Sequence, residues 1–352
     1  MTDPLGDAAA DALAVDRRKV RRPRVLLVDE GAGGSRSNYG QALRAGAVSE
    51  LIEVVSSADA IERLARFSAI ECVICTVRYP GLDGLEVLRT SKILRPRTPV
   101  LLIAAEADPH IPGMAIRDGA DDFLVEPLDP AELCTRVATL IEKGRIAREA
   151  EAQTVLAIGA HPDDVEISIG GTLIRHVADG NRVIELVMTD GESGGEKGVR
   201  IAEAERGAKL VGATLLRGQL PDGFLSDAHE TVAVIASAVE TYVPSVIYVH
   251  TRHDVHQDHR ATYDAAMSAA RTVPTVYCYQ SPSSTVNFCP TRFVDIGDYL
   301  DLKMELINLY RSQTTTRLYL AEDMIRATAR YWGRYAVRRF VEPLEIIRLQ
   351  AP

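Results

Sequence analysis

Two groups of ionisable residues in the second half of the chain have the types and spacing of a divalent-metal site. The first is AHPDDVE, which places His161, Asp163 and Asp164 close together. The second is a later cluster that contains His250, His253, Asp254, His256, Asp258 and His259. Imidazoles and carboxylates bind catalytic zinc, which is typically held by three protein ligands and keeps one position open for water. The two groups together therefore predict a metal centre.

Both groups follow apolar, β-branched runs that predict buried strands. One run covers residues 155–158, and the other covers residues 246–249. After the first group, Gly170 and Gly171 lead into a helical pattern, and residues 183–188 predict the next strand. Because ligands of open α/β sheets bind at the carboxyl ends of strands, we expect the two groups to meet at one edge of a parallel sheet.

These residues resemble the LmbE/PIG-L family of zinc-dependent N-deacetylases, and the resemblance covers about residues 153–348. AHPDDVE and the two glycines match the first motif of that family, and the cluster from Asp254 to His259 matches the second. Further matches are TDGE at 189–192, Arg200 with Glu203, PDG at 221–223, DIGDYLDLK from Asp295 and RSQ ending at Gln313. The matches occur in order along the domain, which supports the resemblance more than one motif would.

The resemblance implies a role for each residue of the two motifs. Zn²⁺ is expected on His161, Asp164 and His259, with Asp163 as the general base. His256 is expected to stabilise the oxyanion, protonated and held by Asp258 beside it. These roles agree with amide hydrolysis, which needs an activated water, oxyanion stabilisation and a proton for the leaving amine. Fe²⁺ or another divalent ion would suit the same ligand types.

Other candidate residues keep two interpretations. The resemblance implies that Arg200 and Asp222 contact a sugar, while a structural salt bridge or a helix cap remains the alternative. Glu166 is one residue too many for a three-ligand site, so we expect it to support the ligands. His250 and His253 remain alternative extra ligands. The remaining histidines, His110, His176 and His229, are expected to be ordinary surface or core residues.

The family resemblance implies a hydrolase that removes an N-acetyl group from an amino sugar or sugar conjugate of the N-acetylglucosamine type. Tyr310 stands where many relatives have a histidine, and the C-terminal YAVRRF matches the family only loosely. These departures leave the identity of the sugar open. The alternative function is a non-catalytic regulatory protein that uses the same fold to sense a sugar ligand.

The first half of the chain predicts a separate α/β domain. Short apolar runs alternate with helical patterns, which is typical of parallel strands joined by helices. The runs are 25–28, 51–55, 72–77, 100–104 and 123–125. We expect a flexible tail over 1–22, a flavodoxin-like domain over 23–147 and a Rossmann-like deacetylase domain over 148–352.

This first domain resembles a response-regulator receiver domain. The matching segments are LLVDE with Asp29 and Glu30, YPGLDGLEVL from Tyr79, and GADDFLVEPLDPAEL from Gly119. The positions of the phosphoacceptor aspartate, the hydroxyl residue and the lysine hold Thr76, Ala104 and Glu126. Without these groups no acyl phosphate forms or is neutralised, so we expect a pseudo-receiver that serves regulation or oligomerisation. Asp29 and Glu30 remain an alternative cation site.

Composition limits the class of partner and the compartment. Of 352 residues, 46% are apolar and 25% are charged, and the net charge of −9 argues against nucleic acid as a main partner. No apolar run is long enough to span a membrane, and no signal peptide is evident, so we expect a cytoplasmic protein. The five cysteines do not predict a disulfide framework. Cys72 and Cys75, three apart in a predicted strand, are expected to be buried thiols on opposite faces.

Overall fold

The computed structural model divides the chain into two compact units, with the boundary between Glu151 and Ala152. It describes residues 24–29, 35–46, 48, 50–66, 70–77, 83–104 and 110–350. The tail expected over 1–22 and the acidic residue Glu30 lie outside the described residues. The predicted boundary after residue 147 falls within the last turn of a helix that ends at Ala150.

The first unit contains a five-stranded, all-parallel sheet. Its strands are β1 (Arg24–Val28), β2 (Glu50–Val54), β3 (Ile70–Val77), β4 (Val100–Ala104) and β5 (Asp122–Val125). They lie in the order β2-β1-β3-β4-β5, and every neighbouring pair is parallel. This strand order is the flavodoxin-like one, so the predicted fold of the first unit is confirmed.

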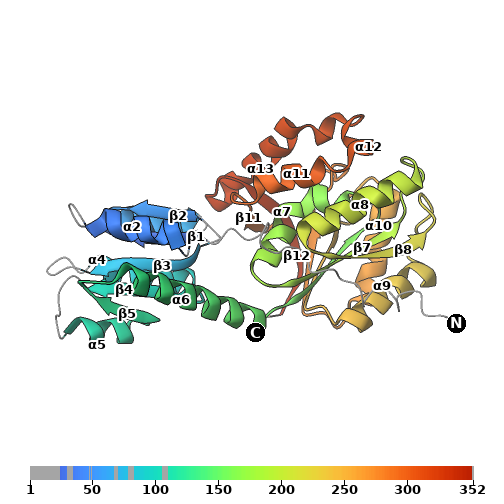
Figure 1. Ribbon diagram of the computed structural model, residues 1–352. Helices are drawn as coiled ribbons and strands as arrows, with labels where there is room; N and C mark the ends of the chain where they lie inside the picture. The colour runs from blue at the N-terminus through green and yellow to red at the C-terminus, as the bar shows by residue number, and fades with distance from the viewer. Residues whose placement is uncertain are drawn as a thin grey trace. The chain divides into compact units, whose positions relative to one another are not determined.

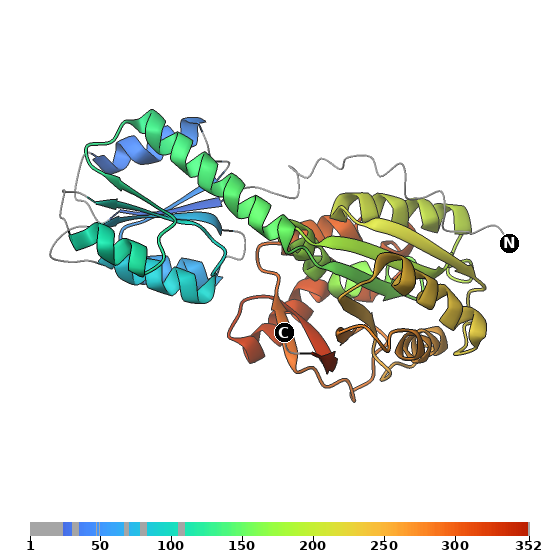
Figure 2. The same cartoon turned by 90° about the horizontal axis from the view of Figure 1, so that it is seen from below.

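Helices cover both faces of this sheet, as Figure 2 shows. They are α2 (Ser35–Gly46), α3 (Ser57–Arg66), α4 (Asp83–Leu94), α5 (His110–Arg117) and α6 (Pro130–Ala150). Helices α2 and α6 enclose one apolar cluster, which contains Cys72, while α3, α4 and α5 enclose the other, which contains Cys75. Both thiols are unpaired and fully buried, as the strand period predicts.

Two of the positions that the sequence analysis compared with a receiver phosphorylation site, Thr76 and Glu126, form hydrogen bonds within the chain. The Thr76 hydroxyl, near the end of β3, lies 3.3 Å from Val28 O and 3.2 Å from Asp29 Oδ1. Glu126 follows β5 and accepts a hydrogen bond of 3.1 Å from the Tyr39 hydroxyl. The side chains that replace the phosphoacceptor and the lysine thus have partners within the fold.

The second unit is built on a mixed sheet of seven strands. They are β6 (Thr154–Gly159), β7 (Arg182–Thr189), β8 (Thr214–Leu220), β9 (Val246–His250), β10 (Thr275–Tyr279), β11 (Arg292–Asp295) and β12 (Val341–Leu349). The parallel part has the order β8-β7-β6-β9-β10, the Rossmann-like arrangement, and this prediction is also confirmed. Strand β12 pairs antiparallel with both β10 and β11. The sequence analysis did not predict this antiparallel extension.

Two helical layers cover the second sheet (Figure 1). Its helices are α7 (Asp164–Ala178), α8 (Lys197–Val211), α9 (His229–Tyr242), α10 (Gln257–Ala269), α11 (Leu300–Ile307), α12 (Arg311–Thr314) and α13 (Glu322–Ala336). Helices α9 and α10 pack against each other, and their apolar faces join the main core of this unit. Helix α7 packs instead against α8 and α11.

Helix α7 is broken where the two glycines occur. Ile169 has non-helical φ and ψ angles of −133° and 19°, so the helix restarts at Gly170. The buried carboxylate of Glu342, on β12, accepts the amide hydrogens of Gly171 at 3.0 Å and Thr172 at 2.7 Å. The Glu342 carboxylate thus supplies acceptors for amide hydrogens that a broken helix leaves without partners. Lys303 donates to the same carboxylate at 2.6 Å.

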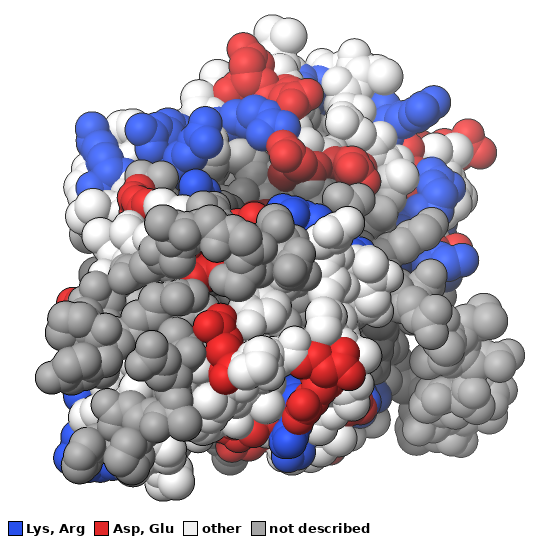
Figure 3. Space-filling view, turned by 60° about the vertical axis from the view of Figure 1, so that its left-hand side comes forward, with Lys and Arg blue, Asp and Glu red and all other residues white. Residues whose placement is uncertain are grey.

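No helix within the described ranges is both long and apolar enough to cross a membrane. On the face that Figure 3 presents, acidic and basic side chains are interspersed over the described surface.

Candidate metal centre

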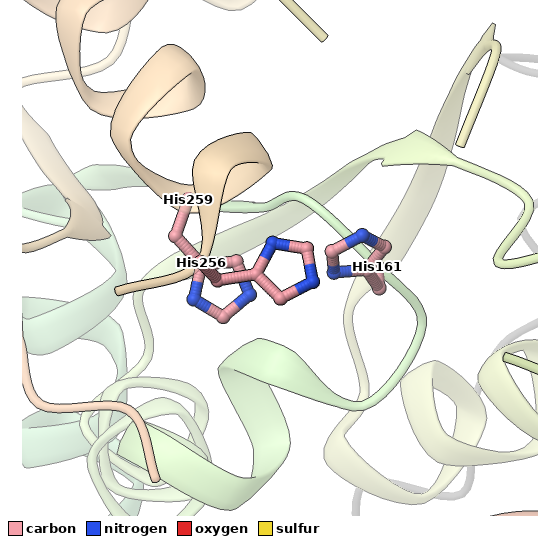
Figure 4. Close-up of side chains that lie close together, drawn as sticks. All are labelled: His161, His256 and His259. Atoms are coloured by element: carbon pink, nitrogen blue, oxygen red, sulfur yellow. The ribbon is translucent and has the colours of Figure 1, made fainter. Parts of the chain in front are cut away.

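The two predicted motifs meet at the edge of the second sheet. His161 follows β6, and His256 and His259 lie at the start of α10, which follows β9. Strands β6 and β9 are neighbours at the point where the strand order reverses, the usual ligand position in such sheets. Figure 4 shows the three imidazoles gathered there.

Asp164 lies close to both of the other expected ligands, through a different carboxylate oxygen for each, and it also forms a metal-capable group with His250 and His259. Asp164 Oδ2 lies 3.3 Å from His161 Nδ1, and Asp164 Oδ1 lies 3.4 Å from His259 Nε2. Two donors that are each about 2.1 Å from a tetrahedral ion lie about 3.4 Å apart. His161 and His259 also belong to a group whose donor atoms, together with one of His256, all lie within 4.8 Å of one another. The donor types and spacing therefore fit a divalent ion.

Carboxylates flank both nitrogens of the His161 ring. On the Nε2 side, Asp222 Oδ1 lies at 3.0 Å and Asp258 Oδ2 at 3.3 Å. Burial disfavours the charged imidazole, but the surrounding carboxylates outweigh that effect and raise the pKa of His161 to about 12. A metal must therefore displace a proton from this ring when it binds.

Asp163 has a strained backbone and a buried side chain. Its φ of 105° lies in the left-handed region that non-glycine residues rarely adopt. Burial raises the pKa of Asp163 to about 7, although the Arg200 guanidinium opposes that shift. Oδ1 accepts a hydrogen bond from Arg200 at 3.1 Å, and Oδ2 has no hydrogen-bond partner among the described residues. One carboxylate oxygen is thus available for proton transfer.

The partner that the structure gives to the His256 ring is a backbone amide. Its Nδ1 accepts a hydrogen bond of 3.2 Å from the backbone amide of Asp258, as an N-terminal cap of α10. Burial, followed by the charges of His259 and His161, lowers the pKa of His256. Because Nδ1 accepts this hydrogen bond, a neutral ring carries its proton on Nε2. The Asp258 carboxylate instead accepts from Gly223 N at 2.7 Å and from Leu225 N at 3.2 Å.

His250 lies directly behind the expected ligands. Its ring stacks on His259 with centroids 3.8 Å apart, and its Nε2 accepts a hydrogen bond of 3.1 Å from Ala160 N. Burial lowers the pKa of His250 to about 4, so the ring is neutral. The nitrogen nearest to Asp164 is thus already used by a backbone amide, which favours support over ligation. His253 belongs to none of the metal-capable groups among the described residues.

Two known families match this chain, one in each of its two units. The family described as GlcNAc-PI de-N-acetylase, PIG-L, matches residues 156–270, and the response regulator receiver domain matches residues 25–138. The chain joins a receiver domain to a PIG-L domain. Both recognised resemblances are therefore confirmed.

Relatives of the PIG-L domain are matched along most of their own length. The uncharacterized deacetylase YaiS of Escherichia coli K12 is 29% identical over 182 residues, which cover 49% of this chain and 98% of YaiS. Diacetylchitobiose deacetylase of Thermococcus kodakarensis is 24% identical over 224 residues, 56% of this chain and 84% of that protein. The solved N,N'-diacetylchitobiose deacetylase of Pyrococcus horikoshii has a TM-score of 0.51 at 23% identity, covers 63% of this chain and 94% of its own, and shares the fold.

Asp254 is the residue of the PIG-L domain whose role sequence reasoning missed. Its Oδ2 lies 3.0 Å from His259 Nδ1, and its Oδ1 accepts a hydrogen bond of 2.7 Å from Ser283. Ser281 also donates to the Asp254 carboxylate. The DxHxDH pattern placed Asp254 beside the ligands, but no sequence signal indicated which imidazole it orients.

The remaining predicted residues lie at the rim or below the metal centre. Asp222, expected to contact a sugar, has Oδ1 beside His161, while Oδ2 accepts from Ser193 N at 2.8 Å. Arg200 is 2% exposed and bonds to groups of the chain. Glu166 accepts a hydrogen bond from the Tyr310 hydroxyl, a support from below the site.

The other predicted non-ligand histidines lie away from the centre. His176 is held between the Tyr248 hydroxyl and Asn181, at 2.9 Å from each. His229 begins helix α9 on the surface. The side chain of His110 is outside the described residues. Neither His176 nor His229 belongs to a metal-capable group in the described part of the chain.

Proposed function

We propose that the PIG-L domain is a Zn²⁺-dependent hydrolase that removes an N-acetyl group from an amino sugar or sugar conjugate of the N-acetylglucosamine type. One observation carries the proposal: Asp164 lies 3.3 Å from His161 and 3.4 Å from His259, beside a buried carboxylate, Asp163, whose pKa is raised to about 7. The likeness to diacetylchitobiose deacetylase supports the substrate class.

His161, Asp164 and His259 are the residues that would hold the ion. A divalent ion at that position polarises a carbonyl oxygen and lowers the pKa of water, the two effects that metal hydrolases use. Fe²⁺ suits the same donors, so the choice of Zn²⁺ as the native metal is itself part of the proposal.

Asp163 acts as the general base in this proposal. It takes a proton from the attacking water and returns it to the leaving amine nitrogen. A base works best when its pKa is near the operating pH, and burial gives Asp163 such a value. Its Oδ2 has no other hydrogen-bond partner among the described residues, so the proton has an acceptor.

His256 stabilises the tetrahedral oxyanion. The Asp258 amide occupies Nδ1, which leaves the Nε2 proton for a hydrogen bond to the developing charge. A fixed neutral donor is sufficient for this role, as backbone amides in oxyanion holes show. Asp258 contributes indirectly, because its carboxylate holds Gly223 and Leu225 at the mouth of the site.

The decisive experiment is to measure acetate release from N,N'-diacetylchitobiose and a panel of N-acetylglucosamine conjugates, with and without Zn²⁺. Asp163→Asn should retain the metal and lose about 100-fold or more in kcat, because proton transfer by a positioned base contributes that much. Asp264→Asn, an exposed carboxylate change on α10, is the matched control and should remain active. Equal activity of Asp163→Asn would remove Asp163 from the mechanism.

The absence of release from every compound, with zinc bound, would favour the alternative of a sugar sensor. In that case the same sugars should still bind to the zinc-loaded protein, as calorimetry can show. Binding without turnover thus separates the sensor from the hydrolase.

We propose that the receiver domain serves regulation or oligomerisation without phosphorylation. The substitutions at Thr76, Ala104 and Glu126 support this role. Light scattering of the full chain and of residues 152–352 tests it. A dimer that persists in the fragment would exclude the receiver as the oligomerisation domain.

A further inference from the structure

Arg200 is enclosed by groups of its own chain. Its Nη2 donates to Pro162 O at 2.6 Å and to Asp163 Oδ1 at 3.1 Å, and its Nη1 donates to Gly191 O at 3.1 Å. Its side chain is only 3% exposed. The two terminal nitrogens of the guanidinium therefore bind the loop that carries Asp163 and the loop that follows β7, while Nε has no hydrogen-bond partner among the described residues.

The loop after β7 is closed over this guanidinium. A Cβ atom at Gly191 would lie 2.5 Å from Arg200 Nη1, and one at Gly194 would lie 2.7 Å from the same nitrogen. A Cβ at Gly195 would lie 3.4 Å from Arg200 Cδ. The backbone of this glycine-rich loop can approach so closely because it has no side chains there.

The group that Arg200 holds is a strained turn. Asp163 combines a φ of 105° with a ψ of −21°, a strained conformation for a residue other than glycine. Such strain persists only where the surroundings fix it. Arg200 binds the turn at two points, because its Nη2 contacts both the carbonyl of Pro162 and the carboxylate of Asp163.

We infer that Arg200 is a positioning residue that fixes the left-handed turn at Asp163. The inference rests on the proposed function in one respect, the role of Asp163 as general base. In this arrangement Oδ1 of Asp163 stays bound to the guanidinium, and Oδ2 of Asp163 is the oxygen that exchanges the proton.

Kinetics of Arg200→Lys and Arg200→Met with N,N'-diacetylchitobiose test the inference. A misplaced base should lower kcat by about 100-fold while KM changes less than about twofold, since an error of 1 Å in position has an effect of that size. Guanidinium chloride at millimolar concentration should restore part of the kcat of Arg200→Ala. A rise in KM with unchanged kcat would show a substrate contact and overturn the inference.

Arg217→Lys is the matched control. Arg217 also pairs with a buried carboxylate next to the glycine-rich loop, binding Asp190 at 3.0 and 2.8 Å, but it does not bond to Asp163. It should keep the wild-type kcat. An equal loss of kcat in both variants would indicate general loosening of the loop and would contradict a specific role for Arg200.

A crystal structure of Arg200→Met separates this inference from the proposed function. If the wild type releases no acetate, the hydrolase proposal fails, yet the inference still requires φ of Asp163 to leave the left-handed region in the variant. An unchanged φ near 105° would overturn it whatever the activity. Zinc content of the same crystals shows whether the ligands remain in place.

Discussion

The imidazole of His259 has a carboxylate beside each ring nitrogen. Asp164 lies at 3.4 Å from Nε2, and Asp254 lies at 3.0 Å from Nδ1. When Nδ1 donates to Asp254, the Nε2 lone pair is directed at the metal position. Asp254 thus fixes the tautomer and the orientation of a ligand although it is not expected to bind the ion.

Asp254→Asn should therefore weaken metal binding without removing a ligand. Loss of such an orienting carboxylate typically lowers metal affinity by about 10- to 100-fold. Competition with a chromogenic chelator measures this change. Asp301→Asn, an exposed substitution on α11, is the control, and unaltered affinity of the Asp254 variant would show that His259 does not depend on its partner.

Glu185 is a second residue whose environment has a measurable effect. It lies within β7 and is 1% exposed, and neither carboxyl oxygen has a hydrogen-bond partner among the described residues. Burial, followed by the nearby charge of Glu166, raises the pKa of Glu185 well above its usual value of 4.5. The folded protein therefore keeps Glu185 protonated where the unfolded chain has lost that proton.

This difference predicts a pH-dependent stability. Because the folded pKa is raised, the native state binds more protons, and stability falls as the pH rises above about 4.5, by about 1.4 kcal/mol per unit up to the folded pKa. Glu185→Gln should abolish that fall. Denaturant unfolding at pH 5 and pH 7 measures it, with the exposed Glu205→Gln as control. Parallel pH profiles for wild type and Glu185→Gln would contradict the assignment.

The sequence could predict which segments carry the donors, since His161 and His259 follow strands whose carboxyl ends meet in a parallel sheet. It could not predict the partners of Arg200 or Asp254. Those depend on which atoms face each other after loops from distant parts of the chain have packed. The contact between His256 and the backbone amide of Asp258 depends in the same way on the folded start of α10.

Among the elements, α7 depends on a strand from the far end of the chain. The break at Ile169 leaves amide hydrogens inside the fold, and Glu342 of β12 accepts them while Lys303 of α11 balances its charge. The buried Glu342 carboxylate thus accepts hydrogen bonds from one ammonium group and two backbone amides, and these contacts offset the cost of removing its charge from water. Helix α7 is thus stabilised by β12 and α11, two elements that the sequence analysis did not predict.

Glu342→Gln should destabilise the PIG-L domain by about 3–5 kcal/mol, because it leaves the Lys303 ammonium buried without its counter-charge. Thermal or denaturant unfolding measures the loss. The double variant Glu342→Gln with Lys303→Met removes both charges and should recover part of the stability. A single variant as stable as wild type would show that the carboxylate charge is not needed there.

The parallel strands could be predicted because each βα unit repeats a local pattern of apolar run and helix. The antiparallel pair β11 and β12 carries no such pattern, and its place beside β10 depends on contacts between distant residues. Register in an antiparallel addition is decided by packing and not by the order of the chain.

At the scale of the whole molecule, two α/β units with different strand orders follow each other in one chain. The boundary in the structure, between Glu151 and Ala152, follows the end of α6 at Ala150. Helix α6 is therefore continuous through the position after residue 147 at which the sequence analysis placed the boundary. We propose residues 152–352 as the fragment that tests the PIG-L domain alone.

Acetyl phosphate should leave the full chain unmodified. Thr76 lacks the carboxylate that forms an acyl phosphate, and its hydroxyl already contacts Val28 and Asp29. Intact-mass spectrometry checks this outcome, with the triple variant Thr76→Asp, Ala104→Thr and Glu126→Lys as the matched positive control. A phosphoryl adduct on the wild-type receiver would contradict the pseudo-receiver prediction.

The position of β12 has a consequence for biosynthesis. The ribosome makes α7 long before it makes Glu342, yet the second half of α7 receives its buried acceptor only from that residue. Domains generally fold as units during synthesis. The second half of α7 therefore gains this acceptor only after β12 has left the ribosome, and termination before β12 would leave the buried amides of Gly171 and Thr172 without the Glu342 carboxylate.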